Sequence, residues 1–376
     1  MSSKKILLVY GAGAIGRGFI PWVFPPKDFE YYYVETNSQL RNQLNLRKSF
    51  TAYKTTASGY VSLEVPILKC YNLSEEKEVI NQVHAVLTAV GPRNIIRISE
   101  SLTKTQFPVL CLENDFSVPQ TLKNATQNPN IVFGIPDVIT SNTAPPQLLE
   151  KDPLAIITED GVCFIDEQVS ILGGNAKYIS KKEIVNQWLA KLYLHNTPHC
   201  IAAYLGSFTH KTYIHEAMQN SLVVTTVSGA MEEMKSMLLK KYDLSQDFLN
   251  WYCEKELQRF QNQLLFDPIS RVAREPFRKL APNDRLIGAA ELCLSCGILP
   301  SNIFIGIMAA FCYENPQDPD FAIAHLMRAL NPQDFLKIII RLRPAEALYE
   351  ALLKGWDVSI SFLRSLSSQK VVSHEC

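Results

Sequence analysis

Three polar residues, Lys191, Asn196 and His199, lie in the short segment KLYLHNTPH at residues 191–199. Lys191 belongs to the otherwise apolar run WLAKLYL, so we expect it to be partly buried. Burial lowers the pKa of a lysine toward neutrality, where it can act as a general base. Asn196 could donate to a substrate oxygen that gains negative charge, and His199 could orient the same hydroxyl. The set suits proton transfer from an alcohol; the alternative is three structural residues in one helix.

The N-terminal segment ILLVYGAGAIG predicts a dinucleotide as the partner of that chemistry. Gly11, Gly13 and Gly16 have G-x-G-x-x-G spacing after a short apolar run. In such a turn the glycines permit the bend, the approach of the pyrophosphate and close helix packing, in that order. Glu35, at the end of the next predicted strand, would accept hydrogen bonds from the adenosine ribose. Its charge would repel a 2′-phosphate, which favours NAD over NADP.

A second cofactor contact is predicted at TAVG, residues 88–91, after a later strand. Thr88 and Gly91 could equally be ordinary residues at the end of a strand. The full set of predicted cofactor residues is Gly11, Gly13, Ile15, Gly16, Glu35, Asn37, Thr88 and Gly91.

Two other ways of moving the alcohol proton are less well supported. A catalytic zinc needs several converging ligands, but Pro198 stands between His195 and His199, and no zinc motif surrounds them. Tyr178 and Lys182 have Tyr-x-x-x-Lys spacing, yet the glycine motif differs from that of short-chain dehydrogenases. We therefore predict no metal.

A basic stretch, RVAREPFRKLAPNDR at residues 271–285, stands out in a chain whose formal net charge is zero. Converging guanidinium groups suit a phosphate, because they are always charged and bind it bidentately. Arg274 and Arg278 are the candidates for phosphate contact. The alternative is a solvated helix face whose charges pair internally, for example with Glu275 and Asp284.

These motifs together resemble the polyol-specific long-chain dehydrogenases, the mannitol dehydrogenase family. The similarity covers KLYLHNTPHCIAAYLG, YGAGAIGRGFI, TAVGP, CLEN at 111–114 and RVAREPFRKLAPNDRLIG at 271–288, and so nearly the whole chain. The resemblance implies that Lys191 is the general base and that Asn196 and Asn114 form the oxyanion hole. It also implies that His199 binds substrate and that Arg271 and Lys279 hold polyol hydroxyls.

The chain departs from the family pattern at two places. Where the family has a Val-Asp-Arg-Ile run, this sequence reads PDVIT at 136–140, which keeps Asp137 for substrate binding but has Val138 in place of the arginine. The usual Asn-Pro is Asn262-Gln263. Both changes bear on recognition of the polyol.

The expected reaction is the NAD-dependent interconversion of a sugar-alcohol phosphate and a ketose phosphate, foremost mannitol 1-phosphate and fructose 6-phosphate. A free polyol, a pentitol phosphate or a hexonate is the nearest alternative substrate. A non-catalytic NAD(H)-binding regulator is the alternative from another class.

The elements that must position these residues fall into two groups. Strand-like runs at 6–10, 31–36, 84–91, 107–114 and 130–135 alternate with polar or helical stretches, which predicts a doubly wound, Rossmann-type parallel sheet. From about residue 181 helical periodicity dominates, for example at 213–241 and 320–354. We predict an NAD-binding domain at 1–190 and a helical catalytic domain at 191–376.

Composition agrees with a globular enzyme. Hydrophobic residues make up 47% and charged residues 20% of the 376 residues, and the zero net charge gives no argument for nucleic acid or an anionic membrane. The nine scattered cysteines, with Cys200 beside His199, favour reduced thiols. We expect a cytoplasmic protein that is a monomer or a small homo-oligomer.

Overall fold

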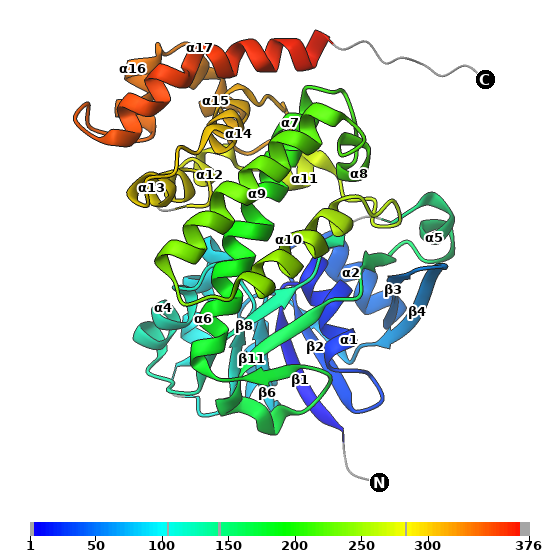
Figure 1. The fold of residues 1–376 in the computed structure, drawn as a ribbon. Coiled ribbons are helices and arrows are strands. Elements are labelled where there is room, and N and C mark those ends of the chain that lie inside the picture. The colour runs from blue at the N-terminus through cyan, green and yellow to red at the C-terminus, as the bar shows by residue number, and fades with distance from the viewer. Residues whose placement is uncertain (1–3, 104, 142–143, 283, 369–376) are drawn as a thin grey trace. The chain divides into compact units, whose positions relative to one another are not determined.

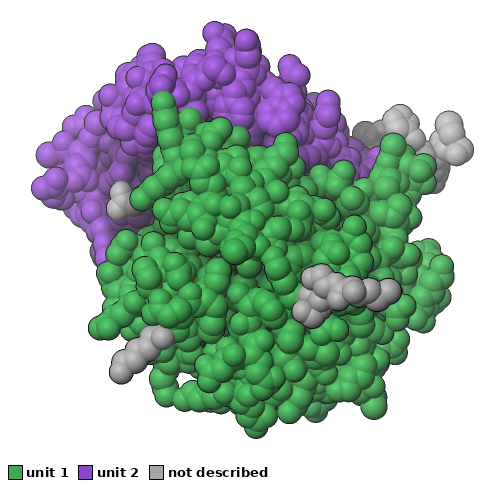
Figure 2. Space-filling view, turned by 90° about the horizontal axis from the view of Figure 1, so that it is seen from below, with its two compact units in different colours: residues 1–188, 264–266 green, residues 189–263, 267–376 purple. Residues whose placement is uncertain are grey.

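The computed structural model describes residues 4–103, 105–141, 144–282 and 284–368. The chain divides into two compact units, coloured green and purple in Figure 2. Unit 1 comprises Met1–Trp188 with Leu264–Phe266, and unit 2 comprises Leu189–Gln263 with Asp267–Cys376. The functional roles that we assign to residues 1–190 and 191–376 stay a prediction.

Unit 1 is built on an eight-stranded sheet with the order β12-β11-β8-β7-β6-β1-β2-β5 (Figure 1). Its strands are β1 (Lys5–Tyr10), β2 (Phe29–Val34), β5 (Lys69–Tyr71), β6 (Ala85–Thr88), β7 (Val109–Cys111), β8 (Ile131–Asp137), β11 (Val162–Asp166) and β12 (Lys177–Ile179). The strands from β8 to β5 pair in parallel, and β11 is antiparallel to β8. The five predicted strand regions correspond to β1, β2, β6, β7 and β8, and the predicted Rossmann-type sheet is confirmed.

The central strand β1 shows why this sheet is buried on both faces. Leu7 and Val9 belong to one core cluster, whereas Leu8 and Tyr10 belong to another. All four side chains are fully buried. Since successive side chains of a strand point to opposite faces, a continuous apolar run places one core on each side of the sheet.

Short helices connect these strands, and the first of them is unusual. After the glycine turn the chain forms a π-helix, Ala14–Phe19, and then a single α-helical turn, α1 (Ile20–Val23), before Pro25 and Pro26. The other helical segments of unit 1 are α2 (Ser38–Arg47), Glu75–Glu78, Ile80–Gln82, Pro92–Ile98, α3 (Ser99–Leu102), α4 (Val118–Thr126), α5 (Pro146–Lys151) and Glu167–Leu172.

A second, four-stranded sheet in unit 1 was not predicted. Its order is β4-β3-β10-β9, with β3 (Ser49–Thr56), β4 (Gly59–Pro66), β9 (Thr140–Ser141) and β10 (Ile156–Thr158). The β3–β4 hairpin turns through Ala57-Ser58, because Thr56 pairs with Gly59. That turn lacks the Asn-Gly or Asp-Gly sequence that signals most tight hairpins. The other two strands are too short to be recognised by their periodicity.

Unit 2 is helical throughout its described part. Helix α6 (Lys181–Ala190) begins in unit 1 and ends in unit 2. It continues into a π-helix, Lys191–Asn196, and then into α7 (Thr197–Ser207), whose residues from Thr197 to Gly206 are all buried. The later segments are α8 (Ile214–Ala217), α9 (Ser221–Lys241), α10 (Gln246–Phe260), α11 (Ile269–Ala273), α12 (Pro276–Lys279), α13 (Ile287–Ser295), α14 (Ser301–Cys312), α15 (Phe321–Arg328), α16 (Pro332–Asp334), Phe335–Ile339 and α17 (Ala347–Ser368). Helix α7 contacts α9, α11 and α14, so it forms the centre of this unit's core.

The two long helical regions predicted in unit 2 are interrupted. Asn220 accepts hydrogen bonds from the amides of Leu222 and Val223 and starts α9 there, which separates it from α8. The region 320–354 divides at Asn331-Pro332 and again before α17. No helix in the described part of the chain is long and apolar enough to cross a membrane.

Candidate active site

The glycine turn has the geometry that its sequence predicts. Gly11 has φ +91°, and a Cβ there would lie 2.5 Å from the Ala89 carbonyl oxygen. A Cβ on Gly16 would lie 1.9 Å from the Gly11 carbonyl oxygen, so only glycine permits this packing. Gly13 is exposed and meets nothing within 4 Å, which leaves its backbone open to a ligand. Ile15 is partly buried and packs on the core beneath the turn.

Arg17 fastens this turn to the second sheet. Its Nε donates to the Ala12 carbonyl at 2.6 Å, and its Nη1 donates to the Leu154 carbonyl, just before β10, at 2.5 Å. The guanidinium also lies over the ring of Phe50 on β3, 5.5 Å from its centroid. The unpredicted sheet therefore holds the backbone of the glycine turn in place.

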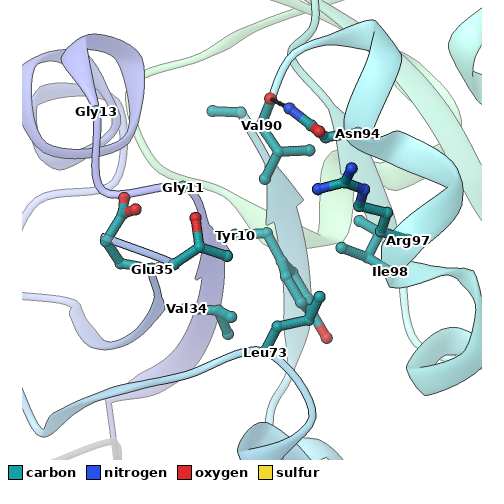
Figure 3. A pocket seen from close by; sticks show the side chains of 12 residues that line it. Tyr10, Gly11, Gly13, Val34, Glu35, Leu73, Val90, Asn94, Arg97 and Ile98 are labelled. Carbon is teal, nitrogen blue, oxygen red and sulfur yellow. Dashed lines mark hydrogen bonds between the residues drawn. The ribbon is translucent and has the colours of Figure 1, made fainter. Parts of the chain in front are cut away.

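A pocket opens beside the turn at the carboxyl ends of β1 and β2, and Figure 3 shows its side chains. Glu35 lies on one side, and Asn94 and Arg97 from the helix Pro92–Ile98 lie on the other. The residues that line it are Tyr10, Gly11, Gly13, Val34, Glu35, Thr36, Leu73, Ala89, Val90, Asn94, Arg97 and Ile98. The apolar members and the facing carboxylate suit an adenosine group, and this position at the strand ends is where Rossmann sheets bind nucleotides.

Two backbone amides orient the Glu35 carboxylate. Ala12 N donates to Oε2 at 3.0 Å, and Asn37 N donates to Oε1 at 2.8 Å. Each oxygen keeps a further lone pair for a ribose hydroxyl. The Asn37 side chain itself caps α2 by accepting from Leu40 N at 3.0 Å.

The other predicted cofactor residues have different surroundings. Thr88 is fully buried, and its hydroxyl donates to Glu113 Oε2 at 2.6 Å. The other oxygen of Glu113 accepts from Val90 N at 3.1 Å, so this carboxylate fixes the loop that borders the pocket. Gly91 has φ +84° and precedes the helix that carries Arg97. Neither Thr88 nor Gly91 lines the pocket itself.

Lys191 and Asn196 are the first and last residues of the π-helix in unit 2. The amide of Thr197 donates to the Leu192 carbonyl, five residues back, instead of four. Pro198 has no N–H and cannot continue an α-helical ladder, which accounts for the wider turn here. Lys191 is 5% exposed and Asn196 is 6% exposed. The predicted partial burial of the lysine is therefore observed.

His199, in the first turn of α7, is held by a buried carboxylate. Its Nε2 lies 3.0 Å from Asp267 Oδ2, and the other carboxylate oxygen accepts from Arg271 Nε at 2.8 Å and from its Nη2 at 2.5 Å. Burial alone would raise the pKa of Asp267, but Arg271 and His199 together hold it below its ordinary value. The structure thus connects two predicted substrate residues, His199 and Arg271, through an aspartate that sequence reasoning missed.

Two of the five basic residues in this stretch form ion pairs within it. Arg278 lies 3.4 Å from a Glu275 oxygen and 3.6 Å from an Asp284 oxygen, and Arg285 Nε donates to Asp284 at 2.9 Å. These are the pairs that the alternative reading named. Arg274 is exposed, and no ion pair joins its side chain to another described residue.

Lys279 is buried at the end of this stretch. Its ammonium donates to the Val272 carbonyl at 2.6 Å and to the Arg274 carbonyl, and it lies 5.4 Å from the centre of the Tyr204 ring. Burial lowers the pKa of Lys279 to about 7. This lysine closes the turn between α11 and α12, in addition to any contact with substrate.

Asp137 is the last residue of β8 in unit 1, and Val138 follows it. Asp137 is buried, and Val138 belongs to the core. A Cβ on Gly161 would lie 2.5 Å from the Val138 Cβ, so the valine fills the space over that glycine. Asn114 also belongs to unit 1; it follows β7 and is exposed.

Several residues of the two sites were not predicted. In the pocket these are Tyr10, Leu73, Asn94 and Arg97, and beside the π-helix they are Asp267, His195 and Glu256. Tyr10 and His195 lie inside the motifs, but no spacing assigned them these contacts. Leu73, Glu256 and Asp267 lie outside the motifs, and no spacing signals them. Among the described residues no group of three or more His, Cys, Asp and Glu side chains is arranged to hold a metal ion.

Unit 1 has a Rossmann sheet with an open glycine turn, and unit 2 buries a lysine and an asparagine on one turn. Together these features define a dinucleotide-dependent oxidoreductase. Comparison with known proteins then gives the family. The family models for the mannitol dehydrogenase Rossmann domain and the mannitol dehydrogenase C-terminal domain match residues 5–128 and 185–334. The chain belongs to the mannitol dehydrogenase family, and the predicted family, enzyme class and NAD cofactor agree with this.

Relatives cover most of the chain. It is 30% identical to the mannitol-1-phosphate 5-dehydrogenase of Thermoanaerobacter pseudethanolicus over 335 residues, which is 82% of this chain and 86% of that one. It is 30% identical to the Brevibacillus brevis protein of the same name over 340 residues, 83% and 87% of the two chains. The fold is similar to that of Pseudomonas fluorescens mannitol 2-dehydrogenase in a ternary complex with NAD and D-mannitol. The TM-score is 0.79 at 14% identity, over 98% of this chain and 95% of that one.

Proposed function

We propose that this enzyme interconverts a sugar-alcohol phosphate and a ketose phosphate with NAD(H), foremost mannitol 1-phosphate and fructose 6-phosphate. The observation that supports this most directly is the buried π-helix from Lys191 to Asn196, which we call the π-turn. It is followed by His199, which Asp267 holds in place. The names of the relatives at 30% identity support the same substrate pair.

Lys191 is the proposed general base. In the oxidation its neutral amine takes the proton of the substrate hydroxyl, and Asn196 and Asn114 donate hydrogen bonds to the oxygen that gains negative charge. In the reduction the ammonium of Lys191 returns a proton to that oxygen. His199, kept in place by Asp267, orients the hydroxyl. No metal takes part in this scheme.

The residues of the glycine turn fit NAD. Gly13 leaves room for the pyrophosphate, and the Glu35 carboxylate faces the pocket with free lone pairs for the ribose. Bound NAD supplies the hydride acceptor of the reaction. Because Glu35 is anionic, we propose that the enzyme discriminates against the 2′-phosphate of NADP.

The phosphate end of the substrate is assigned to Arg274. Its guanidinium is exposed, whereas Arg278 and Arg285 already face Glu275 and Asp284. Arg271 and Lys279 are proposed to hold polyol hydroxyls, together with Asp137 from unit 1. An unpaired guanidinium is the better phosphate ligand, because it need not break an existing ion pair.

Replacing Lys191 by Ala tests the mechanism. We expect turnover to fall by about 100-fold or more, since general acid–base catalysis contributes about this much. The dissociation constant of NADH, measured by fluorescence titration, should stay unchanged, because the glycine turn belongs to unit 1. Turnover close to that of the unmodified enzyme would exclude Lys191 as the base.

A substrate panel tests the phosphate. We expect NADH to be oxidised rapidly with fructose 6-phosphate and slowly with fructose, and Arg274→Ala to reduce only the reaction of the phosphate ester. Two observations favour the second candidate, a free polyol or another sugar-derived alcohol. One is the internal pairing of Arg278 and Arg285, and the other is Val138 in place of the family arginine. Equal rates with the two ketoses would support that candidate. NADH binding without turnover on any polyol or ketose would instead support a regulator.

A further inference from the structure

A second histidine–carboxylate pair lies beside the one that holds His199. His195 Nδ1 is 2.5 Å from Glu256 Oε2, and the two residues are 4% and 0% exposed. The mechanism proposed above uses neither of them. His195 stands inside the π-turn, immediately before Asn196, and Glu256 lies on α10.

The two pairs are built alike. Glu256 also bonds Arg259 and lies 3.2 Å from Lys255, just as Asp267 bonds Arg271. The imidazole rings of His195 and His199 are 5.2 Å apart, and both pack on Phe260, at 5.7 Å and 4.9 Å. Each imidazole is therefore fixed by a carboxylate, an arginine and one shared aromatic ring.

This arrangement ties the π-turn to α10. A π-turn has poorer backbone packing than an α-helix and needs support from its surroundings. Glu256 and Phe260 both come from α10, so this one helix holds His195 by a hydrogen bond and His199 by ring stacking. Since Lys191 and Asn196 are the ends of the same turn, their positions depend on how His195 is held.

A requirement for stability alone does not explain the pair. Replacing a buried ion pair with apolar side chains of similar volume is often neutral or stabilising. Glu256 is fully buried and contacts an imidazole and two cations. It is therefore suited to fixing one position of these groups. An ionised carboxylate only accepts, so Nδ1 is the donor in this hydrogen bond, which sets the orientation of the ring.

We propose that His195 and Glu256 form a positioning pair that holds Lys191 and Asn196 in their catalytic geometry. The inference rests on the proposed function, because it concerns the same general base. Neither residue is assigned contact with the substrate.

Three variants of the full-length enzyme test this pair. His195→Leu and Glu256→Gln should lower kcat by about 100-fold, the cost typical of a displacement of about 1 Å at a catalytic group. The KM and the dissociation constant of NADH should stay unchanged. His195→Asn should retain more of kcat than His195→Leu, because its amide can donate to Glu256 from near the position of Nδ1.

Glu233→Gln is the matched control. Glu233 is a carboxylate of α9 that accepts from Asn302 N at 2.8 Å and from Ile303 N at 3.2 Å, and so caps α14. This variant should lower the melting temperature without a selective loss of kcat. Rates are compared at a temperature where every variant is fully folded.

The outcomes separate the two proposals. If the unmodified enzyme turns over no polyol or ketose, the proposed function fails before any variant is compared. If it is active but His195→Leu and Glu256→Gln lose no more kcat than Glu233→Gln, the positioning role is wrong. Equal losses in His195→Asn and His195→Leu would also overturn it, since the hydrogen bond would then have no effect.

Discussion

Glu35 combines two tasks in one side chain. Its carboxylate holds the amides of Ala12 and Asn37, and it faces the pocket where the ribose is expected. The same oxygens therefore fix the glycine turn and, in the proposed function, bind the ribose of the cofactor. Loss of the charge should change the shape of the turn as well as the selectivity of the enzyme for NAD over NADP.

Replacing Glu35 by Ser should shift the enzyme toward NADP(H). We expect the ratio of kcat/KM for NADPH to that for NADH to rise by about tenfold or more, equivalent to about 1.4 kcal/mol. The absolute value for NADH should fall, because the ribose and Ala12 N both lose an acceptor. Steady-state rates with each cofactor measure this, and Glu64→Ser, an exposed carboxylate on β4, serves as the control. An unchanged ratio would contradict the role of Glu35.

Lys279 should give the stability of the protein a distinctive pH dependence. Burial lowers the pKa of Lys279 to about 7 in the folded chain, whereas an unfolded lysine has a pKa of about 10.4. Between these values the unfolded chain binds a proton that the folded chain does not. The contribution of Lys279 to the free energy of unfolding therefore rises with pH, by about 1.4 kcal/mol per unit at most.

Urea unfolding of the unmodified protein and of Lys279→Met at pH 7 and pH 9 tests this. The unmodified protein should gain stability relative to the variant by about 2 kcal/mol between these two pH values. Taking the difference removes the titration of all other groups. A difference that stays constant would show that Lys279 keeps an ordinary pKa.

At the scale of elements, the π-turn is the feature that places Lys191 and Asn196. Pro198 interrupts the α-helical ladder at the start of α7, and the Thr197 amide bonds five residues back. An insertion of this kind costs helical stability, and it persists where function needs the altered geometry.

Pro198→Ala should restore part of the regular ladder and turn Lys191 away from Asn196. We expect kcat to fall by about tenfold or more and the melting temperature to stay equal or rise, because a backbone donor is regained. Steady-state kinetics and thermal unfolding measured side by side give both quantities. Pro300→Ala, at the N-cap of α14, is a control in which kcat should not change. A loss of stability together with full activity would contradict this account.

At the scale of the whole molecule, the two units are not simple successive segments. Leu264–Phe266 belong to unit 1 although unit 2 surrounds them in sequence. Tyr60 OH donates to the Leu264 carbonyl at 2.9 Å, and Ser141 Oγ donates to the Phe266 carbonyl at 3.0 Å. The chain also crosses from unit 1 to unit 2 within the helical run that begins with α6.

We therefore expect the protein to unfold in one cooperative transition. At a concentration of about 100 Kd, NADH should stabilise the folded chain by about 2.7 kcal/mol and raise the midpoint of that single transition. Calorimetry with and without NADH measures this. Two transitions of which NADH raises only one would show that the units unfold independently.

The local sequence was enough to predict features that depend only on residue type and on neighbours close in sequence. The apolar run before Gly11 is buried on both sides of the sheet, and the glycines occur where a Cβ would clash or where the backbone is open. Lys191 is buried as its apolar neighbours indicated. Such features follow from residue types and short spacings, which one sequence contains in full.

Other features depend on contacts between distant segments. Asp267 reaches His199 across 68 positions, Glu256 reaches His195 across 61, and Arg17 reaches Leu154 across 137. No periodicity indicates such pairs, because their geometry is set only when helices and strands pack. The internal pairing of Arg278 and Arg285 with Glu275 and Asp284 also needed coordinates, since charges close in sequence can face apart.

The sequence by itself determined the Rossmann sheet, the helical second half and the residues from which the chemistry can be built, because these follow from periodicity and motif spacing. Tertiary structure alone decided that a second sheet anchors the glycine turn, and that two carboxylates hold the two histidines. The physical reason is that burial and long-range hydrogen bonds are properties of the packed chain, and they arise only when distant segments meet.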